Sequence, residues 1–166
     1  GTSVSMGWAS DGVNVNSQNN AWPKQLAEMA GVGFTIPGIA EPGCPPPAAS
    51  PLISFRRIDG SPATGSTVCS PNVPGVTLPT NDLAVENATA REALNATPET
   101  ATQGRGPVTS RVLPSGMTQI TAMKSLNPTL VSVEFGGNEI LPAQVGLLFP
   151  GVTFTPFETF KANYDQ

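Results

Sequence analysis

Residues 129–135 read Thr-Leu-Val-Ser-Val-Glu-Phe, and this run is the strongest strand signal in the sequence. A shorter apolar run at 81–85 predicts a second strand. Helical patterns at 88–95 and 116–126 lie between the two runs, and Asn127-Pro128 ends the second helix. Strands that alternate with helices favour an α/β domain with a mostly parallel sheet.

Helical patterns also occur near both ends of the chain. The stretch 20–31 predicts a short helix, with Pro23 in its first turn and Gly31 at its end. Its apolar face is expected to belong to the core and comprises Trp22, Leu26, Met29 and Ala30. The segment 155–166 predicts a second helix that begins near a proline and has no stop signal.

The composition indicates one folded domain. Hydrophobic residues make up 39% of the 166 residues, and charged residues make up 12%. The net charge of −4 argues against a nucleic-acid partner, because such proteins carry a basic patch. No apolar run is long enough to span a membrane. With no histidine and two cysteines, the sequence predicts neither a metal site nor another cofactor.

The two cysteines, Cys44 and Cys69, lie in a stretch rich in proline and glycine from 38 to 79. A loop of this length in a compact domain needs a function or a covalent constraint. One interpretation is a disulfide that closes the loop and stabilises the fold by about 3 kcal/mol in the loop-entropy model. The other is a pair of free thiols. A disulfide would imply a secreted, periplasmic or cell-surface protein.

Three segments rich in small and polar residues are expected to meet at the carboxyl edge of the predicted sheet. They are residues 1–7, 83–89 and 134–139. Ligands of open α/β sheets bind at that edge. A serine in a glycine-flanked turn can point its hydroxyl at a ligand, and backbone N–H groups with an asparagine amide can stabilise an oxyanion.

These segments resemble, in order and spacing, the first three conserved blocks of SGNH/GDSL hydrolases. In the first block, Gly-Thr-Ser resembles the family's Gly-Asp-Ser and implies that Ser3 is the nucleophile and that its backbone N–H binds the oxyanion. The second block implies that the Asn87 backbone N–H binds the oxyanion. The third, Gly-Gly-Asn-Glu, implies the same role for the Asn138 amide, with Gly136 and Gly137 contacting the substrate. Trp22-Pro23 and the Pro-Gly-Cys-Pro run at 42–45 resemble secreted bacterial members.

The sequence departs from the family pattern at three positions and at its end. Thr2 replaces Asp, Asn87 replaces Gly, and Glu139 replaces Asp. Asn87 keeps its backbone N–H and tolerates the left-handed conformation that glycine would supply. The fourth block, Asp-x-x-His, is missing, and a serine nucleophile needs such a base. We therefore expect an excerpt that lacks its first strand and C-terminal part, with little or no activity.

The resemblance implies a single domain over 1–166 with a flavodoxin-like three-layer α/β/α sandwich of the SGNH hydrolase type, here incomplete. It also implies hydrolysis of a carboxylic ester through an acyl-enzyme. Short-chain acyl esters, acetylated glycans and lipid esters are all candidate substrates, and no pattern indicates an oligomeric state. Two other functions remain open: a non-catalytic module that binds a carbohydrate or an acyl group, and a structural surface domain.

Overall fold

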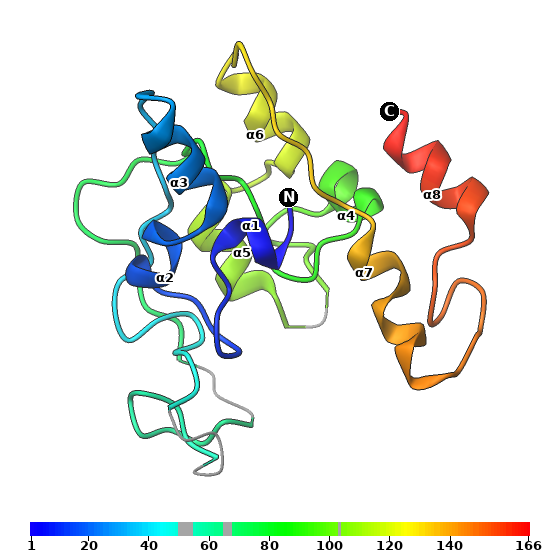
Figure 1. The fold of residues 1–166 in the computed structure, drawn as a ribbon, viewed down its shortest axis with the longest axis horizontal. Helices are drawn as coiled ribbons and strands as arrows, with labels where there is room; N and C mark the ends of the chain where they lie inside the picture. The colour runs from blue at the N-terminus through cyan, green and yellow to red at the C-terminus, as the bar shows by residue number, and fades with distance from the viewer. Residues whose placement is uncertain (50–54, 65–67, 103) are drawn as a thin grey trace.

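The computed structural model describes residues 1–49, 55–64, 68–102 and 104–166 (Figure 1). Helices account for 34% of the chain. The helices of the described residues are α1 (Ser3–Met6), α2 (Val15–Asn19), α3 (Trp22–Met29), α4 (Ala90–Asn95), α5 (Gly106–Val112), α6 (Gln119–Ser125), α7 (Gly137–Ile140), the 3-10 helix η2 (Leu141–Val145) and α8 (Phe157–Tyr164).

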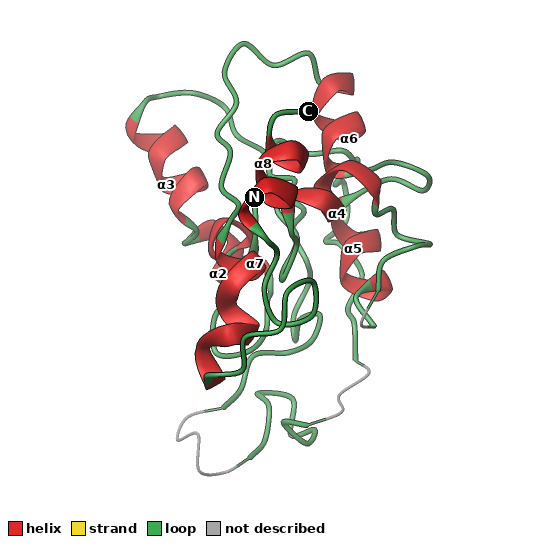
Figure 2. Ribbon diagram, turned by 90° about the vertical axis from the view of Figure 1, so that its right-hand side faces the viewer, coloured by secondary structure: helices red, strands yellow, loops and turns green. Residues whose placement is uncertain are grey.

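The described residues form no β-sheet. Figure 2 shows helices joined by loops, and backbone pairing of the strand type occurs only as isolated bridges, such as the one between Ile39 and Asn72. The predicted flavodoxin-like α/β/α sandwich with a mostly parallel sheet is therefore wrong. Both predicted strands have extended or irregular backbone, and the reason differs between them.

The run 129–135 lacks a neighbouring strand. None of its backbone N–H or C=O groups bonds to a described residue. Its side chains are also largely uncovered, since Leu130 is 86% exposed and Val133 is 54% exposed. Strand propensity expresses how well side chains pack on a pleated, half-buried surface. Without such a surface, the composition of this run does not make a strand.

The run 81–85 is held by hydrogen bonds to Thr35, Gly1 and the Gln119 side chain instead of by a strand ladder. The Nε2 of Gln119, in α6, donates to the backbone oxygens of Gly1 at 2.9 Å and Leu83 at 2.7 Å. Backbone hydrogen bonds join Val85 N to the Gly1 oxygen at 3.2 Å and Asp82 N to the Thr35 oxygen at 3.1 Å. The amide of Gln119 therefore satisfies carbonyl groups that a neighbouring strand would satisfy in a sheet.

The predicted helices are present. The stretches 20–31, 88–95, 116–126 and 155–166 contain α3, α4, α6 and α8. Thr89 and Thr118 cap α4 and α6, and each accepts a hydrogen bond from the third residue of its helix. The predicted core face of α3 is wrong, because Leu26 is 54% exposed and Met29 is 87% exposed. Ala27 is the buried residue of this helix.

The core gathers small and medium-sized side chains from the first 122 residues. Its largest fully buried members include Met6, Ile39 and Leu113. Cys44 belongs to this core and forms a disulfide with Cys69, so the predicted bond is present. Between α3 and α4 no described residue is helical, as the density of proline and glycine predicts.

The C-terminal part runs along one side of the molecule as α7, η2 and α8, and α8 lies beside α4 (Figure 1). The rings of Phe160 and Tyr164 pack with their centroids 5.4 Å apart. Phe157 is 69% exposed and Tyr164 is 48% exposed. Over the described ranges, none of the helices combines the length and hydropathy that a membrane span requires.

Candidate functional site

Glu134 ties the first predicted block to the end of the apolar run 129–135. Its Oε2 accepts the backbone N–H of Thr2 at 2.9 Å, and its two oxygens lie 2.8 and 2.7 Å from the Thr2 hydroxyl. Oε2 also accepts the Ser5 hydroxyl at 3.1 Å. The indole N–H of Trp22 donates to the same Ser5 hydroxyl oxygen at 3.2 Å. The carboxylate therefore fixes residues on both sides of Ser3.

Ser3 itself is the first residue of α1 and is half-buried. Its Oγ makes no hydrogen bond to a described residue, whereas the hydroxyls of Thr2 and Ser5 are both held by Glu134. Within this segment, Ser3 is thus the hydroxyl that remains available to an incoming ligand.

Asn87 occupies a left-handed turn with φ of +54°. The turn is closed by the Ala88 N–H, which donates to the Val85 oxygen at 3.2 Å. The expectation that asparagine tolerates this conformation is confirmed. The Asn87 side chain donates to the Glu86 carboxylate, while its backbone N–H has no described acceptor. Burial raises the pKa of Glu86, although the nearby Arg105 guanidinium opposes the rise.

Asn138 and Glu139 connect the third block to the second. The Nδ2 of Asn138 donates to the Ala88 oxygen at 2.8 Å, and an amide nitrogen has a second hydrogen to offer. Glu139 is buried, and its Oε1 accepts the Ala90 N–H at 2.6 Å. Its Oε2 accepts the Gly136 N–H at 3.0 Å. Gly136 has a φ of +117°, which favours glycine strongly.

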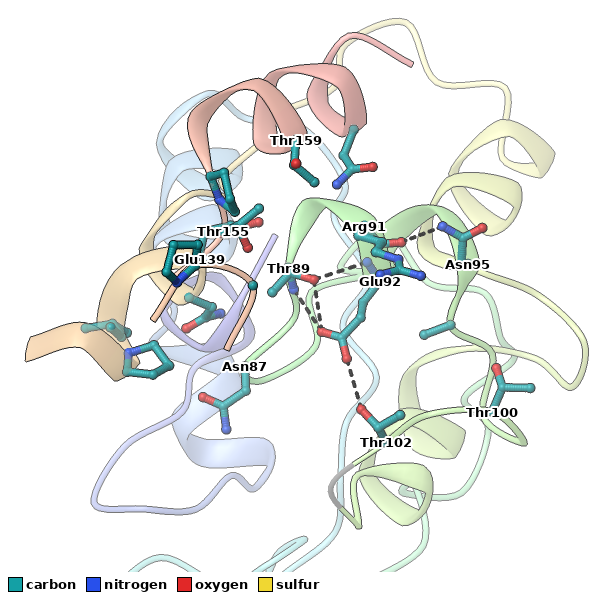
Figure 3. A pocket seen from close by; sticks show the side chains of 18 residues that line it. Asn87, Thr89, Arg91, Glu92, Asn95, Thr100, Thr102, Glu139, Thr155 and Thr159 are labelled. Atoms are coloured by element: carbon teal, nitrogen blue, oxygen red, sulfur yellow. Dashed lines mark hydrogen bonds between the residues drawn. The ribbon is translucent and has the colours of Figure 1, made fainter. Parts of the chain in front are cut away.

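A cavity of about 990 Å³ opens beside these residues, between α4 on one side and the C-terminal helices on the other (Figure 3). Asn87 and Asn138 both line it. Among the described residues that line it, Ser3, Gly136 and Gly137 are not included. The structure therefore brings two of the residues predicted to bind the oxyanion to one cavity. The roles predicted for Ser3 and the two glycines stay predictions.

Comparison with protein families, with curated proteins and with solved structures finds no match to this chain. The similarity to SGNH/GDSL hydrolases rests on the sequence motifs alone.

Two buried ionisable groups lie behind the first block. Asp82 is 4% exposed, and burial raises the pKa of its carboxyl to about 6. Its Oδ1 accepts the Ala84 N–H at 3.0 Å, but its Oδ2 has no partner among the described residues. Burial also lowers the pKa of the Gly1 amino group to about 6, against the opposing charges of Asp82 and Glu134.

Glu92, which lines the cavity, forms an ion pair with Arg105. Arg105 is buried and donates to Glu92, and the Thr89 N–H donates to the same carboxylate at 3.1 Å. Burial alone would raise the pKa of Glu92, but these hydrogen bonds outweigh it and the pKa is lowered. No group of three or more potential ligands gathers to hold a metal ion in the described ranges.

Sequence reasoning missed Glu134 and the polar residues of α8 that line the cavity. The signal for Glu134 was that it is the single charged residue in the run 129–135, whose other members are apolar or carry a hydroxyl group. No comparable signal marks α8, because its role depends on how it packs beside α4.

Proposed function

We propose that this chain carries the nucleophile and the oxyanion-binding groups of an SGNH/GDSL-type ester hydrolase. Ser3 attacks the ester carbonyl. The Asn87 backbone N–H and the second hydrogen of Asn138 Nδ2 bind the oxygen that becomes negatively charged. Such donors stabilise the transition state by a few kcal/mol when they are held in place beforehand.

The observation that carries this proposal is the hydrogen-bonded convergence of three segments far apart in the sequence. Glu134 holds Thr2 and Ser5, which lie on either side of Ser3, and Asn138 is bonded to the residue after Asn87. The free Ser3 hydroxyl and the free Asn87 N–H are the groups that the chemistry requires. The disulfide is compatible with an extracellular location, which we include in the proposal.

The 166 residues contain no histidine, so a base has to be added to test the serine. We expect diisopropyl fluorophosphate to phosphorylate Ser3 slowly, with fluoride as the leaving group, and added imidazole to accelerate the reaction. Mass spectrometry of the tryptic peptides locates the adduct. Ser3→Ala should abolish the labelling, and Asn138→Ala should slow it about a hundredfold, as expected for loss of an oxyanion donor.

Ser132 is the matched control, because it is more exposed than Ser3 and lies two residues from Glu134. Ser132→Ala should leave the labelling rate unchanged. Adducts spread over Ser132 and other exposed serines, or labelling indifferent to imidazole, would contradict the proposal.

A non-catalytic binding module is the second candidate. It is favoured by one observation, that the described lining of the cavity includes Asn87 and Asn138 but not Ser3. In that case Ser3 is not labelled under any condition, and the cavity still binds its ligand.

A further inference from the structure

Helices α4 and α8 present polar rows to the cavity between them. Arg91 and Asn95 lie one turn apart on α4, and Thr159 and Asn163 lie one turn apart on α8. All four residues line the cavity. Residues four apart share a helix face, so each helix turns a polar row toward the hollow (Figure 3).

Helix α8 has no fully buried residue, unlike an ordinary surface helix. A surface helix usually buries an apolar stripe and exposes its polar face. In α8, Phe157 is 69% exposed and Tyr164 is 48% exposed, while the exposed Thr159 and the half-buried Asn163 line the cavity. The groups that fill the space between α4 and α8 must therefore form hydrogen bonds, because an apolar filler would leave these side chains unsatisfied.

Many of these groups have free hydrogen-bonding capacity. Among the described residues, the Thr159 hydroxyl, the Asn163 amide and the Arg91 guanidinium have no partner. The Oδ1 atoms of Asn95 and Asn138 accept no hydrogen bond there, although their Nδ2 atoms donate to Arg91 O and Ala88 O. The cavity thus offers a ligand both hydrogen-bond donors and hydrogen-bond acceptors.

The charges around the cavity exclude a strongly ionic ligand. The negative charge of Glu92 is paired with Arg105, and that of Glu139 is held by two backbone N–H groups. Arg91 is the one cation among the described lining residues. A polyanion would need several cations, and a ligand with many hydroxyl groups needs the mixture of amides and hydroxyls that is present.

We propose that this cavity binds a neutral oligosaccharide. Its volume of about 990 Å³ lies at the upper end of the range of about 300–1,000 Å³ for small-ligand sites, so it can hold several sugar rings. Leu141, Pro142 and Pro150 form an apolar part of its wall, against which the C–H faces of the rings can pack. That this sugar is the alcohol part of the ester attacked by Ser3 rests on the proposed function, but the binding itself does not.

The test uses the whole chain labelled with ¹⁵N and four probes: xylotetraose, cellotetraose, chitotetraose and the anionic tetragalacturonate. We expect at least one neutral probe to saturate the protein below millimolar concentration and to shift amide signals of α4 and α8. Thr159→Ala and Asn163→Ala should each weaken binding about fivefold, as expected for loss of one hydrogen bond. Glu158→Gln is the control, because Glu158 is exposed on the same helix and does not line the cavity.

Ser3→Ala should leave sugar affinity unchanged, so failure of the catalytic proposal is distinguishable from failure of this one. The inference is overturned if no neutral probe binds, if tetragalacturonate binds more tightly than all three, or if Thr159→Ala and Asn163→Ala bind as the original protein does. Should a substitution unfold α8, the shifts in the unsubstituted protein decide, and shifts confined to helices other than α4 and α8 would refute it.

Discussion

Replacing Asp82 with asparagine should stabilise the protein at pH 8 relative to pH 4. Burial raises the pKa of the Asp82 carboxyl from its ordinary value of 3.8 to about 6, so the folded chain binds this proton more tightly than the unfolded chain. The stability that Asp82 contributes is fully present below about pH 4 and is lost as the pH rises through about 6. A pKa difference of about 2 corresponds to about 3 kcal/mol.

The comparison between two pH values isolates this ionisation from packing effects. In the variant, Nδ2 takes the place of Oδ2, which has no hydrogen-bond partner among the described residues. An unsatisfied amide costs about 1–3 kcal/mol, but this cost does not change with pH. The free-energy difference between variant and original should therefore change by about 2–3 kcal/mol between pH 4 and pH 8, in favour of the variant at pH 8.

Urea denaturation followed by tryptophan fluorescence at both pH values measures this difference. The Gly1 amino group, whose pKa burial lowers to about 6, titrates in both proteins, and its pKa falls further in the variant because the Asp82 charge that raises it is lost. A difference between the two proteins that does not vary with pH would refute the reasoning, because Asp82 would then ionise in the folded chain as it does in water.

Three further predictions concern the stability of the fold. Glu134→Ala should lower the free energy of unfolding by about 3 kcal/mol, because charge-assisted hydrogen bonds are lost together, and urea denaturation at pH 7 checks this. The double variant Cys44→Ala/Cys69→Ala should lose about 3 kcal/mol in the same assay, since the bond closes a loop with a sequence separation of 25 residues. Asn87→Ala should destabilise by about 1 kcal/mol through its positive φ, whereas Asn87→Gly should not, and thermal unfolding of both variants compares them.

Helices α3, α4, α6 and α8 were predictable from the sequence because their signals are local, whereas α1, α2, α5 and α7 were not predicted. Thr89 and Thr118 cap their helices through residues three positions away, and the position of Pro23 in the first turn of α3 depends only on its own ring. The side of α3 that faces the core was not predictable, because it depends on which neighbours the helix contacts. Met29 fits an apolar pattern and is nevertheless exposed.

The absence of a sheet from the described residues could not be predicted, because a strand forms only where another strand pairs with it. The run 129–135 has the right composition, but its backbone groups find no neighbour among the described residues. In 81–85, Gln119 supplies from a helix the hydrogen bonds that were expected from a strand. No periodicity in the sequence indicates a side chain that reaches across to a carbonyl group 36 positions earlier.

The sequence predicted individual residues of the candidate site better than it predicted how they are arranged in space. The motifs pointed to Asn87 and Asn138, and these residues do line one cavity. The polar rows on α4 and α8 line one cavity only because these two helices, about 70 positions apart in the sequence, pack beside each other. Asn163 carries no motif and acquires its place only through that packing.

The ring pair of α8 contains an optical reporter, Tyr164, that is separate from the tryptophans. Tyr164 is the only tyrosine of the chain, and both tryptophans lie in its first 22 residues. Tyrosine emission therefore follows the C-terminal helix, while tryptophan emission follows the N-terminal segment in which Trp22 contacts Ser5. A gradual rise in denaturant would show in one experiment whether α8 detaches before the core melts, because the two emission bands would then change at different concentrations.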